Sequence, residues 1–334
     1  MPDKQTIIFK NPPVIVGTYT VAGPKEKKGV FGKYFHLTLD NDMFGETSFE
    51  KAECKMMETA IARAIETSGK KDGDIDLLLG GDLLNQTVSS SFSARKFVIP
   101  YIGVYGACST MAEEFALAAC LISGGTHKTI AVATGSHFSS AERQYRFPLE
   151  LGNQRPPTSQ WTTTGTACAV LEDGAGKKGV KVTNCTFGKV IDFGVVDVNN
   201  MGAAMAPAAF DTLKAHLKNT KTTPDDYDLI VTGDLGKLGE EILIDLCERD
   251  GIKLKNNYCD CGQMLFTNKQ STFMGASGCG CSAIIVNSLI YDRLKEGKYK
   301  KVLYMATGAL LSLVTSQQGE SIPGIAHAVT LEHC

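Results

Sequence analysis

The sequence predicts an α/β protein made of two similar halves, and three observations support this. Strand-like and helix-like segments alternate along the chain, which is typical of parallel sheets covered by helices. The segment 74–83 (DIDLLLGGDL) resembles 226–235 (DYDLIVTGDL), and each follows a helical stretch. When the chain is shifted by 173 residues, nine positions between 108 and 139 are identical, and Cys108-Ser109 falls on Cys281-Ser282. A repeat of this length indicates a duplicated domain.

The elements follow the same order in each half: helix, strand, helix, strand, a Cys-Ser turn, helix, strand and a closing strand. The first helices are expected at about 50–68 and 207–218, and the closing strands share the strings ACAVLED (167–173) and AHAVTLEH (326–333). We therefore predict halves at 1–180 and 181–334, packed around a pseudo-two-fold axis. Two unrelated α/β domains are the alternative, but the matches occur in register and in order.

A segment of the first half, 141–164, has no counterpart in the second. It is rich in proline and aromatic residues, and it holds three arginines and the only tryptophan. Long loops are uncommon unless they bind or cover something, so we expect a binding insert, with a surface excursion of no function weighed equally.

Composition narrows the classes of protein that the chain can belong to. The formal net charge of −2 argues against a nucleic-acid partner, since such proteins usually carry a basic excess. The longest apolar run is too short and too interrupted to span a bilayer, and the first residues lack the apolar core of a signal peptide. The odd number of cysteines, eleven, favours free thiols in a reducing compartment. We expect a soluble, intracellular protein.

One cysteine, Cys108, lies where a short strand (96–104) turns into a helix (109–122). Unpaired N–H groups and the positive end of the helix dipole favour a thiolate at such a position. The sequence therefore raises the question whether Cys108 is a nucleophile or the remnant of one.

The duplicated pattern with this cysteine turn resembles the thiolase-like superfamily, in which two βαβαβαββ halves form a five-layered α/β/α/β/α arrangement. Seven strings narrow the resemblance to the stage V sporulation protein AD (SpoVAD) family of spore-forming Firmicutes: GDLLNQ, YGACSTMAE, ATGSHFSSAERQYRFP, QWTTTG, GDLGKLGEEIL, GASGCGCSA and IPGIAHAVTLE. The resemblance covers nearly the whole chain.

This resemblance implies a function and partners. The family implies binding of dipicolinic acid, alone or as its calcium complex, for uptake into the developing spore. It implies membrane-embedded SpoVA partners and peripheral association with the spore's inner membrane. Because thiolase-like folds usually pair through their sheets, it also implies a homodimer.

Catalysis by Cys108 would need partners that the sequence does not supply. Condensing enzymes use a His and an Asn, or equivalent pairs, to stabilise an oxyanion and move protons. The second-half loop VTGDLGKLGEE has Gly233, Asp234 and Gly236 where such a string would stand, and the turn MGASGCGCSA has neither Asn nor His. We expect a non-enzymatic binding protein. An acyl-transfer enzyme using Cys108 and a CoA ester is the alternative, and a structural dimer that scaffolds membrane partners is a third.

Of the six histidines, only His137 and His327 are placed to approach Cys108, whereas His216 is expected to be solvated in a Lys-rich helix. Arginine is suited to bind the carboxylates of dipicolinate. The insert offers Arg143, Arg146 and Arg155, with Tyr145, Phe147 or Trp161 to cover the ring.

The sequence thus yields one hypothesis for the ligand cavity, which is that five residues line it: Cys108, Ser109, His137, Arg146 and His327. No metal or cofactor is expected. The pairs Cys259/Cys261 and Cys279/Cys281 have C-x-C spacing, whereas structural zinc sites usually have C-x₂₋₄-C.

Overall fold

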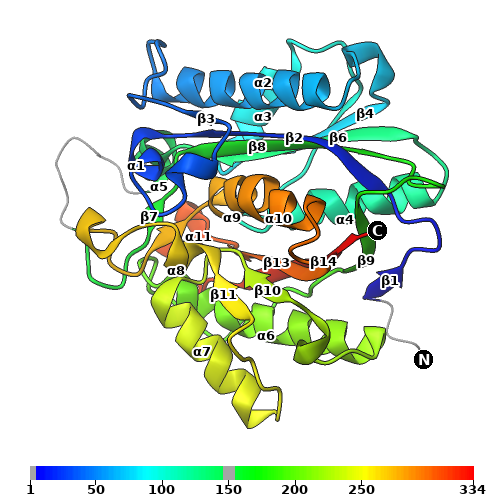
Figure 1. Ribbon diagram of the computed structural model, residues 1–334. Coiled ribbons are helices and arrows are strands. Elements are labelled where there is room, and N and C mark those ends of the chain that lie inside the picture. Colours follow the sequence, from blue (N-terminus) through cyan, green and yellow to red (C-terminus); the bar gives the residue numbers. More distant parts are fainter. Residues whose placement is uncertain (1–4, 146–154) are drawn as a thin grey trace.

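The computed structural model describes residues 5–145 and 155–334, and it has five layers. Figure 1 shows two outer helical layers, two sheet layers and a central layer of helices. The strands are β1 (Thr6–Ile8), β2 (Val14–Ala22), β3 (Leu37–Thr38), β4 (Leu77–Gly81), β5 (Tyr101–Gly103), β6 (Thr129–Ser136), β7 (Trp161–Thr162), β8 (Gly165–Glu172), β9 (Val180–Thr186), β10 (Leu229–Thr232), β11 (Tyr258–Asp260), β12 (Ala276–Ser277), β13 (Lys301–Ala309) and β14 (Gly324–His333). The helices are α1 (Pro24–Lys27), α2 (Phe49–Thr67), α3 (Val88–Ala94), α4 (Thr110–Ser123), α5 (Phe138–Tyr145), α6 (Met201–Thr220), α7 (Gly236–Arg249), α8 (Cys261–Met264), α9 (Cys279–Ile285), α10 (Tyr291–Lys295) and α11 (Leu313–Gln317).

The strand order makes the duplication visible. The main path runs β11-β10-β13-β14-β9-β2-β8-β6-β4-β5, so the two halves mirror each other about the β9·β2 pair. In each half three strands are parallel, and the closing strands β8 and β14 run antiparallel to their neighbours. A short pairing, Val14 with Lys181 and Ile15 with Val180, joins the halves across β2 and β9, and β1 pairs with β9 and β7 with β12. The predicted division at residue 180 falls at the start of β9.

Each helical layer follows from its pattern of apolar residues. Helix α2 buries Ala52, Met56, Ala60 and Ala64, a stripe at i+4 spacing that packs on β2 and β8. Helix α6 covers β13 and β14 in the same way. Helix α4 is apolar on most of its surface and lies in the central layer with α9 and α10, between the two sheets.

Helix α6 begins earlier than predicted. Its first residue is Met201 and not Pro207, and the Asn200 Oδ1 atom caps it by accepting a hydrogen bond from the Ala203 amide. Pro207 therefore lies inside the helix near its N-terminal end, where the missing N–H removes only one intrahelical bond.

The two Cys-containing turns resemble each other, but not at the predicted shift of 173 residues. The Ser109 amide donates to the Gly106 carbonyl and the Cys281 amide donates to the Gly278 carbonyl, both at 3.0 Å, which corresponds to a shift of 172. The left-handed residues of the two turns, Ala107 and Gly278, correspond to a shift of 171. Neither feature places Cys281 opposite Cys108.

Among the described helices, none combines the length and the apolar composition needed to cross a membrane.

Candidate functional site

The Cys108 turn is a strained corner held by its own hydroxyl groups. Ala107 adopts a left-handed conformation with φ of 50°. The Ser109 Oγ atom donates to the Gly106 carbonyl at 2.6 Å, and the Thr110 Oγ1 atom donates to the Ala107 carbonyl at 2.6 Å. On β13, Gly308 faces this corner so closely that a side chain would collide with the backbone at Gly106. Glycine therefore lets the second sheet approach the turn.

Cys108 lines a small inner pocket of about 50 Å³ between the halves. The other lining residues are mainly apolar, with two tyrosines, two hydroxyl residues and one carboxyl: Leu83, Tyr105, Ala107, Glu142, Tyr145, Thr162, Val198, Met201, Ser277, Ala309 and Leu311. Within the described part of the chain, no Arg, Lys or His lines this pocket.

A carboxyl group lies behind the thiol. The Cys108 Sγ atom is 3.9 Å from Ser277 Oγ, which donates to Asp234 Oδ2 at 3.0 Å. Asp234 also accepts from the Gly278 amide at 3.0 Å and from Thr307 Oγ1 at 2.8 Å. Burial raises the pKa of Asp234 to about 7.

The thiolate expected at Cys108 is not favoured. Burial, followed by the Asp234 carboxylate and Cys279, raises the pKa of the Cys108 thiol well above its ordinary value. The prediction from the helix dipole is therefore wrong, because burial and a neighbouring acid outweigh the dipole.

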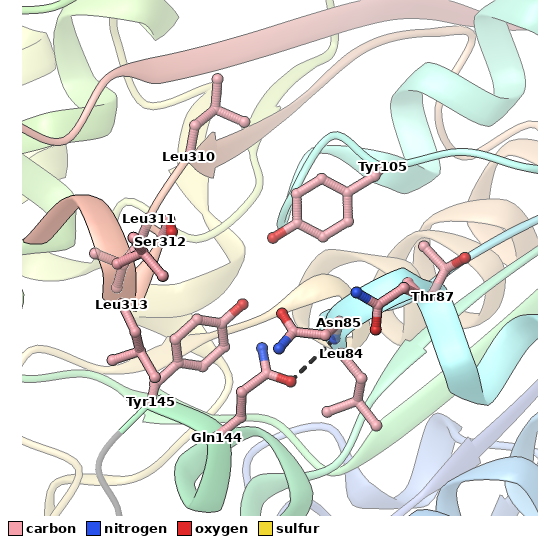
Figure 2. Close-up of a pocket in the computed structure, with 12 residues that line it drawn as sticks. Leu84, Asn85, Thr87, Tyr105, Gln144, Tyr145, Leu310, Leu311, Ser312 and Leu313 are labelled. Atoms are coloured by element: carbon pink, nitrogen blue, oxygen red, sulfur yellow. Dashed lines mark hydrogen bonds between the residues drawn. The ribbon is translucent and has the colours of Figure 1, made fainter.

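A larger outer groove of about 500 Å³ adjoins the inner pocket. Figure 2 shows its wall of amide, hydroxyl and apolar side chains, and none of its lining residues is charged. Gln86 and Thr87 line it in left-handed conformations, with φ of 57° and 47°. The backbone amide of Asn85 donates a hydrogen bond to Gln144 Oε1 at 3.0 Å, which fixes this loop to α5.

Two tyrosines separate the groove from the pocket. Tyr105 and Tyr145 line both cavities, as Leu311 does, and Figure 2 shows the hydroxyl groups of the two tyrosines pointing toward each other. Tyr145 also donates to the Leu83 carbonyl at 2.9 Å. The two tyrosine rings therefore form a wall that the groove and the pocket share.

Cys108 is the only one of the five predicted cavity residues for which the described structure shows a place in the pocket lining. Ser109 is buried within the turn. His137 is buried elsewhere: its Nε2 atom lies 2.8 Å from the Asp42 carbonyl, and its Nδ1 atom accepts from the Ser139 amide at 3.1 Å. His327 accepts from the Gly188 amide at 3.2 Å, and burial lowers its pKa to about 4. Neither histidine lines the pocket. Arg146 lies outside the described residues.

Of the other predicted binding residues, one lines the pocket and two arginines lie away from it. Tyr145 lines the pocket. Arg143 pairs with Glu50 at 3.5 Å, and the Arg155 guanidinium lies 4.9 Å from the centre of the Trp161 ring. Phe147 lies outside the described residues.

His216, expected to be solvated, is fully buried between α6 and the second sheet. Its ring nitrogens lie 2.8 Å from Thr186 Oγ1, 3.1 Å from the Tyr227 hydroxyl and 3.2 Å from Thr330 Oγ1. Burial lowers its pKa to about 3. The Lys-rich composition of α6 was misleading because its lysines occupy only the outer face.

Sequence reasoning missed the roles of Asp234, Ser277 and Tyr105. Asp234 was noticed only as a departure from the thiolase-like pattern, within the GDL string that both halves share. Ser277 and Tyr105 carry no recognisable motif. Across residues 5–145 and 155–334, no three His, Cys, Asp or Glu side chains are grouped to hold a metal ion.

The layers and the strand order give the chain the thiolase-like fold, which solved structures of known proteins share. An acetyl-CoA acetyltransferase from Syntrophomonas wolfei superposes with a TM-score of 0.64 at 13% identity, covering 98% of this chain and 99% of that one. The 3-oxoacyl-[acyl-carrier-protein] synthase III from Aquifex aeolicus VF5 gives a TM-score of 0.56 at 14% identity, covering 96% and 100%. At these identities the likeness establishes the fold alone.

Sequence comparison identifies the family within this class. The stage V sporulation protein AD (SpoVAD) family matches residues 3–332. Stage V sporulation protein AD of Bacillus subtilis (strain 168) is 45% identical over 329 residues, which are 98% of this chain and 97% of that protein. The chain belongs to the stage V sporulation protein AD family.

Proposed function

We propose that the protein is a non-catalytic ligand-binding member of its family, which binds dipicolinic acid, alone or as its calcium complex, for uptake into the developing spore. Membership of the family supports a role in stage V of sporulation. The binding step is our proposal, and it is supported by the chemistry of the site.

The observation that carries the proposal is the pairing of Cys108 with an acid. A condensing enzyme needs a thiolate and donors for the developing oxyanion. Here burial and Asp234 favour the neutral thiol, and the described pocket lining offers no imidazole. Such a site can hold a molecule better than it can transfer an acyl group.

The cavities also suit a planar ligand. Tyr105 and Tyr145 present aromatic rings to both the pocket and the groove, and the groove volume of about 500 Å³ lies within the range of small-molecule sites. Aromatic rings favour offset stacking with another ring.

A second candidate function is acyl transfer from a CoA ester to Cys108. One observation favours it: Asp234, with a pKa of about 7, is close enough to accept the proton of the thiol directly or through Ser277. Acylation of Cys108 is therefore the reaction against which binding must be tested.

Two assays on the purified protein separate these functions. Dipicolinate is titrated by calorimetry with and without calcium, and the intact mass is measured after incubation with acetyl-CoA and longer acyl-CoA esters. We expect a saturable isotherm, retained in Cys108→Ala, and no adduct. An adduct on Cys108 that turns over would show an enzyme and refute the proposal.

The cavity residues predicted from sequence are tested by the same titration. Arg146→Ala and His327→Ala are compared with the parent protein. If both variants bind dipicolinate as tightly as the parent, neither residue contributes to the site.

We further propose that membrane-embedded SpoVA proteins recruit this protein to the inner membrane of the developing spore, and that it acts as a homodimer. The dimer proposal is supported by strand β5, which forms one end of the main strand path and carries the exposed Ile102. Flotation with vesicles that contain the SpoVA proteins tests recruitment, and empty vesicles are the control.

A further inference from the structure

The loop between β9 and α6 exposes three large apolar side chains to solvent. Val190 is 58% exposed, Phe193 67% and Val196 62%. Single exposed apolar residues are common on protein surfaces, whereas several gathered on one short segment mark a surface that contacts another molecule. We name Val190, Phe193 and Val196 the loop face.

Packing of the core does not explain the loop face. The same loop carries a second set of apolar residues, Ile191, Val195 and Val198, and these pack against the core of the second half. The inward set is therefore enough to hold the loop on the protein. The outward set leaves more than half of each residue's surface in solvent.

The loop is held in one conformation by hydrogen bonds. Ile191 and Gly324 exchange two backbone hydrogen bonds, of 2.9 and 2.7 Å, at the start of β14. The Asp192 carboxylate accepts from the Ser321 hydroxyl and from the Gly194 amide. A surface that is already ordered loses little conformational entropy when a partner binds to it.

The charged groups around the loop face are acidic. Asp192 and Asp197 lie within the loop, and Glu320 is next to the segment that holds the loop. The sequence contains no Lys or Arg over residues 190–213 or 302–334, the two stretches that form this region. The loop face is therefore apolar with a negative surrounding.

This charge decides which occupant fits. The nearest cation along the chain, Lys189, pairs with Asp211 at 3.7 Å. Hydrogen bonds from Ser321 and Gly194 lower the pKa of Asp192, so this group is charged at neutral pH. Anionic lipid headgroups repel carboxylates, whereas Lys or Arg beside apolar side chains would pair with them.

We infer that the loop face docks a protein segment that presents apolar side chains flanked by Lys or Arg, with Phe193 as the aromatic anchor. Membrane proteins carry such segments where their spans end on the cytoplasmic side. The inference rests on the recruitment proposed above and deepens it, because it names the surface and the chemistry of the partner. Val198, two residues after Val196, lines the Cys108 pocket, so a docked partner would lie next to that pocket.

The test is flotation of the full chain with increasing amounts of vesicles that contain the SpoVA membrane proteins. Phe193→Ala removes the anchor, Val196→Glu places a charge in the loop face, and Glu320→Lys reverses a neighbouring charge. Val30→Glu and Glu248→Lys are the matched controls, because Val30 is 49% exposed and Glu248 is exposed on α7. Circular dichroism shows whether each variant folds.

Empty vesicles and oligomeric state are measured in parallel. One set of empty vesicles is phosphatidylcholine alone, and the other is phosphatidylcholine with phosphatidylglycerol, which is anionic. Light scattering compares the oligomeric state of the parent with that of Val196→Glu. These measurements show whether a lipid surface or a second copy of the chain covers the loop face instead.

We expect Phe193→Ala and Val196→Glu each to weaken binding to the loaded vesicles at least about tenfold, as loss of an interface anchor does. Glu320→Lys should weaken it as well, and binding should weaken with salt. Both controls should bind as the parent does. Phe193→Ala adds no charge, so it remains informative if Val196→Glu disturbs the loop.

The outcomes separate the two proposals. If the parent does not bind the loaded vesicles, the proposed recruitment fails, and this inference fails with it. If the parent binds and the Phe193, Val196 and Glu320 variants bind equally well, recruitment stands and this inference is wrong. Equal flotation with empty anionic vesicles, or a change of oligomeric state in Val196→Glu, would also overturn it.

Discussion

At the scale of single residues, burial and the neighbouring Asp234 carboxyl raise the pKa of the Cys108 thiol. The helix start beneath the thiol is the arrangement that activates cysteines elsewhere. A carboxylate within hydrogen-bonding reach and almost complete burial reverse that effect. At this corner the neutral thiol of Cys108 is therefore favoured over the thiolate.

Replacing this acid should activate the thiol. In Asp234→Asn the Ser277 and Gly278 contacts can be kept by the amide oxygen, while the negative charge is lost. We expect Cys108 to be alkylated by iodoacetamide on the order of tenfold faster at pH 8.5. The rate is followed by peptide mapping, with the exposed Cys334 as internal reference. An equal gain in Asp82→Asn, the matching position of the repeat, would show that the effect is not local.

The tyrosine pair should control access to Cys108. Tyr145→Phe removes the hydroxyl that donates to the Leu83 carbonyl, and it should cost about 1 kcal/mol of stability. We expect faster labelling of Cys108 in this variant. Tyr101→Phe is the matched control, because its hydroxyl bonds Ser90 at 3.0 Å away from the pocket. If both variants label alike, the pair is not a gate.

At the scale of elements, β5 presents an unpaired edge. It ends the main strand path, and beside it Val98 is 96% exposed, Ile102 49% and Phe92 48%. An exposed apolar edge strand is a template for pairing with another chain. A second copy related by a two-fold axis would pair the two edges.

A charge on this edge should prevent the proposed dimer. We expect Ile102→Lys to be a monomer by light scattering at concentrations at which the parent is a dimer, with an unchanged circular dichroism spectrum. Val314→Lys, a substitution of an exposed valine on α11, should leave the dimer intact. A parent protein that is monomeric at all concentrations would refute the dimer.

The neutral imidazole of His216 connects helix α6 to the second sheet by hydrogen bonds to Thr186 and Thr330. With a pKa of about 3, the His216 ring should show no change in its NMR signals between pH 8 and 5. Since this pKa lies below the ordinary value of 6.5, the stability from His216 is complete above pH 6.5 and is lost as the pH falls toward 3. A ring signal that shifts near pH 6 would contradict this burial.

At the scale of the whole molecule, several carboxyl groups of the described residues are buried without a salt bridge. Burial raises the pKa of Glu26 to about 8 and those of Glu53 and Glu114 well above their ordinary value. In the unfolded chain these groups ionise near pH 4.5. Folding is therefore opposed more strongly as the pH rises.

Glu26 provides the test of this pH dependence. Its contribution to stability is complete below pH 4.5 and is lost as the pH rises to about 8, by at most about 1.4 kcal/mol for each pH unit. Glu26→Gln should flatten the free energy of unfolding between pH 5 and 8 and stabilise the protein at pH 8. Denaturant titration measures this, with the exposed Glu66→Gln as control. An unchanged slope would show that Glu26 is not buried as an acid.

The sequence predicts the fold well because the domain is duplicated, so the same order of strands, turns and helices occurs twice in the chain. The strings around Asp82 and Asp234, and around Cys108, fix the strand–turn–helix units without any knowledge of long-range contacts. The partners of Cys108 could not be predicted, since Asp234 and Ser277 lie more than 120 residues away and reach it only through packing of the halves. His137 shows the converse, because it is near the corner in the chain but faces Asp42.

The small sheet of β7 and β12 has a consequence for communication within the molecule. Trp161 pairs with Ala276 and Thr162 with Ser277, and neighbouring side chains of a strand point to opposite faces. Thr162 and Ser277 face the Cys108 pocket, while Trp161 lies under Lys25 and Arg155. The small sheet thus connects the wall of the Cys108 pocket to the outer side of the molecule at Trp161. A displacement of Trp161 is expected to move Thr162 as well and so to alter the shape of the Cys108 pocket.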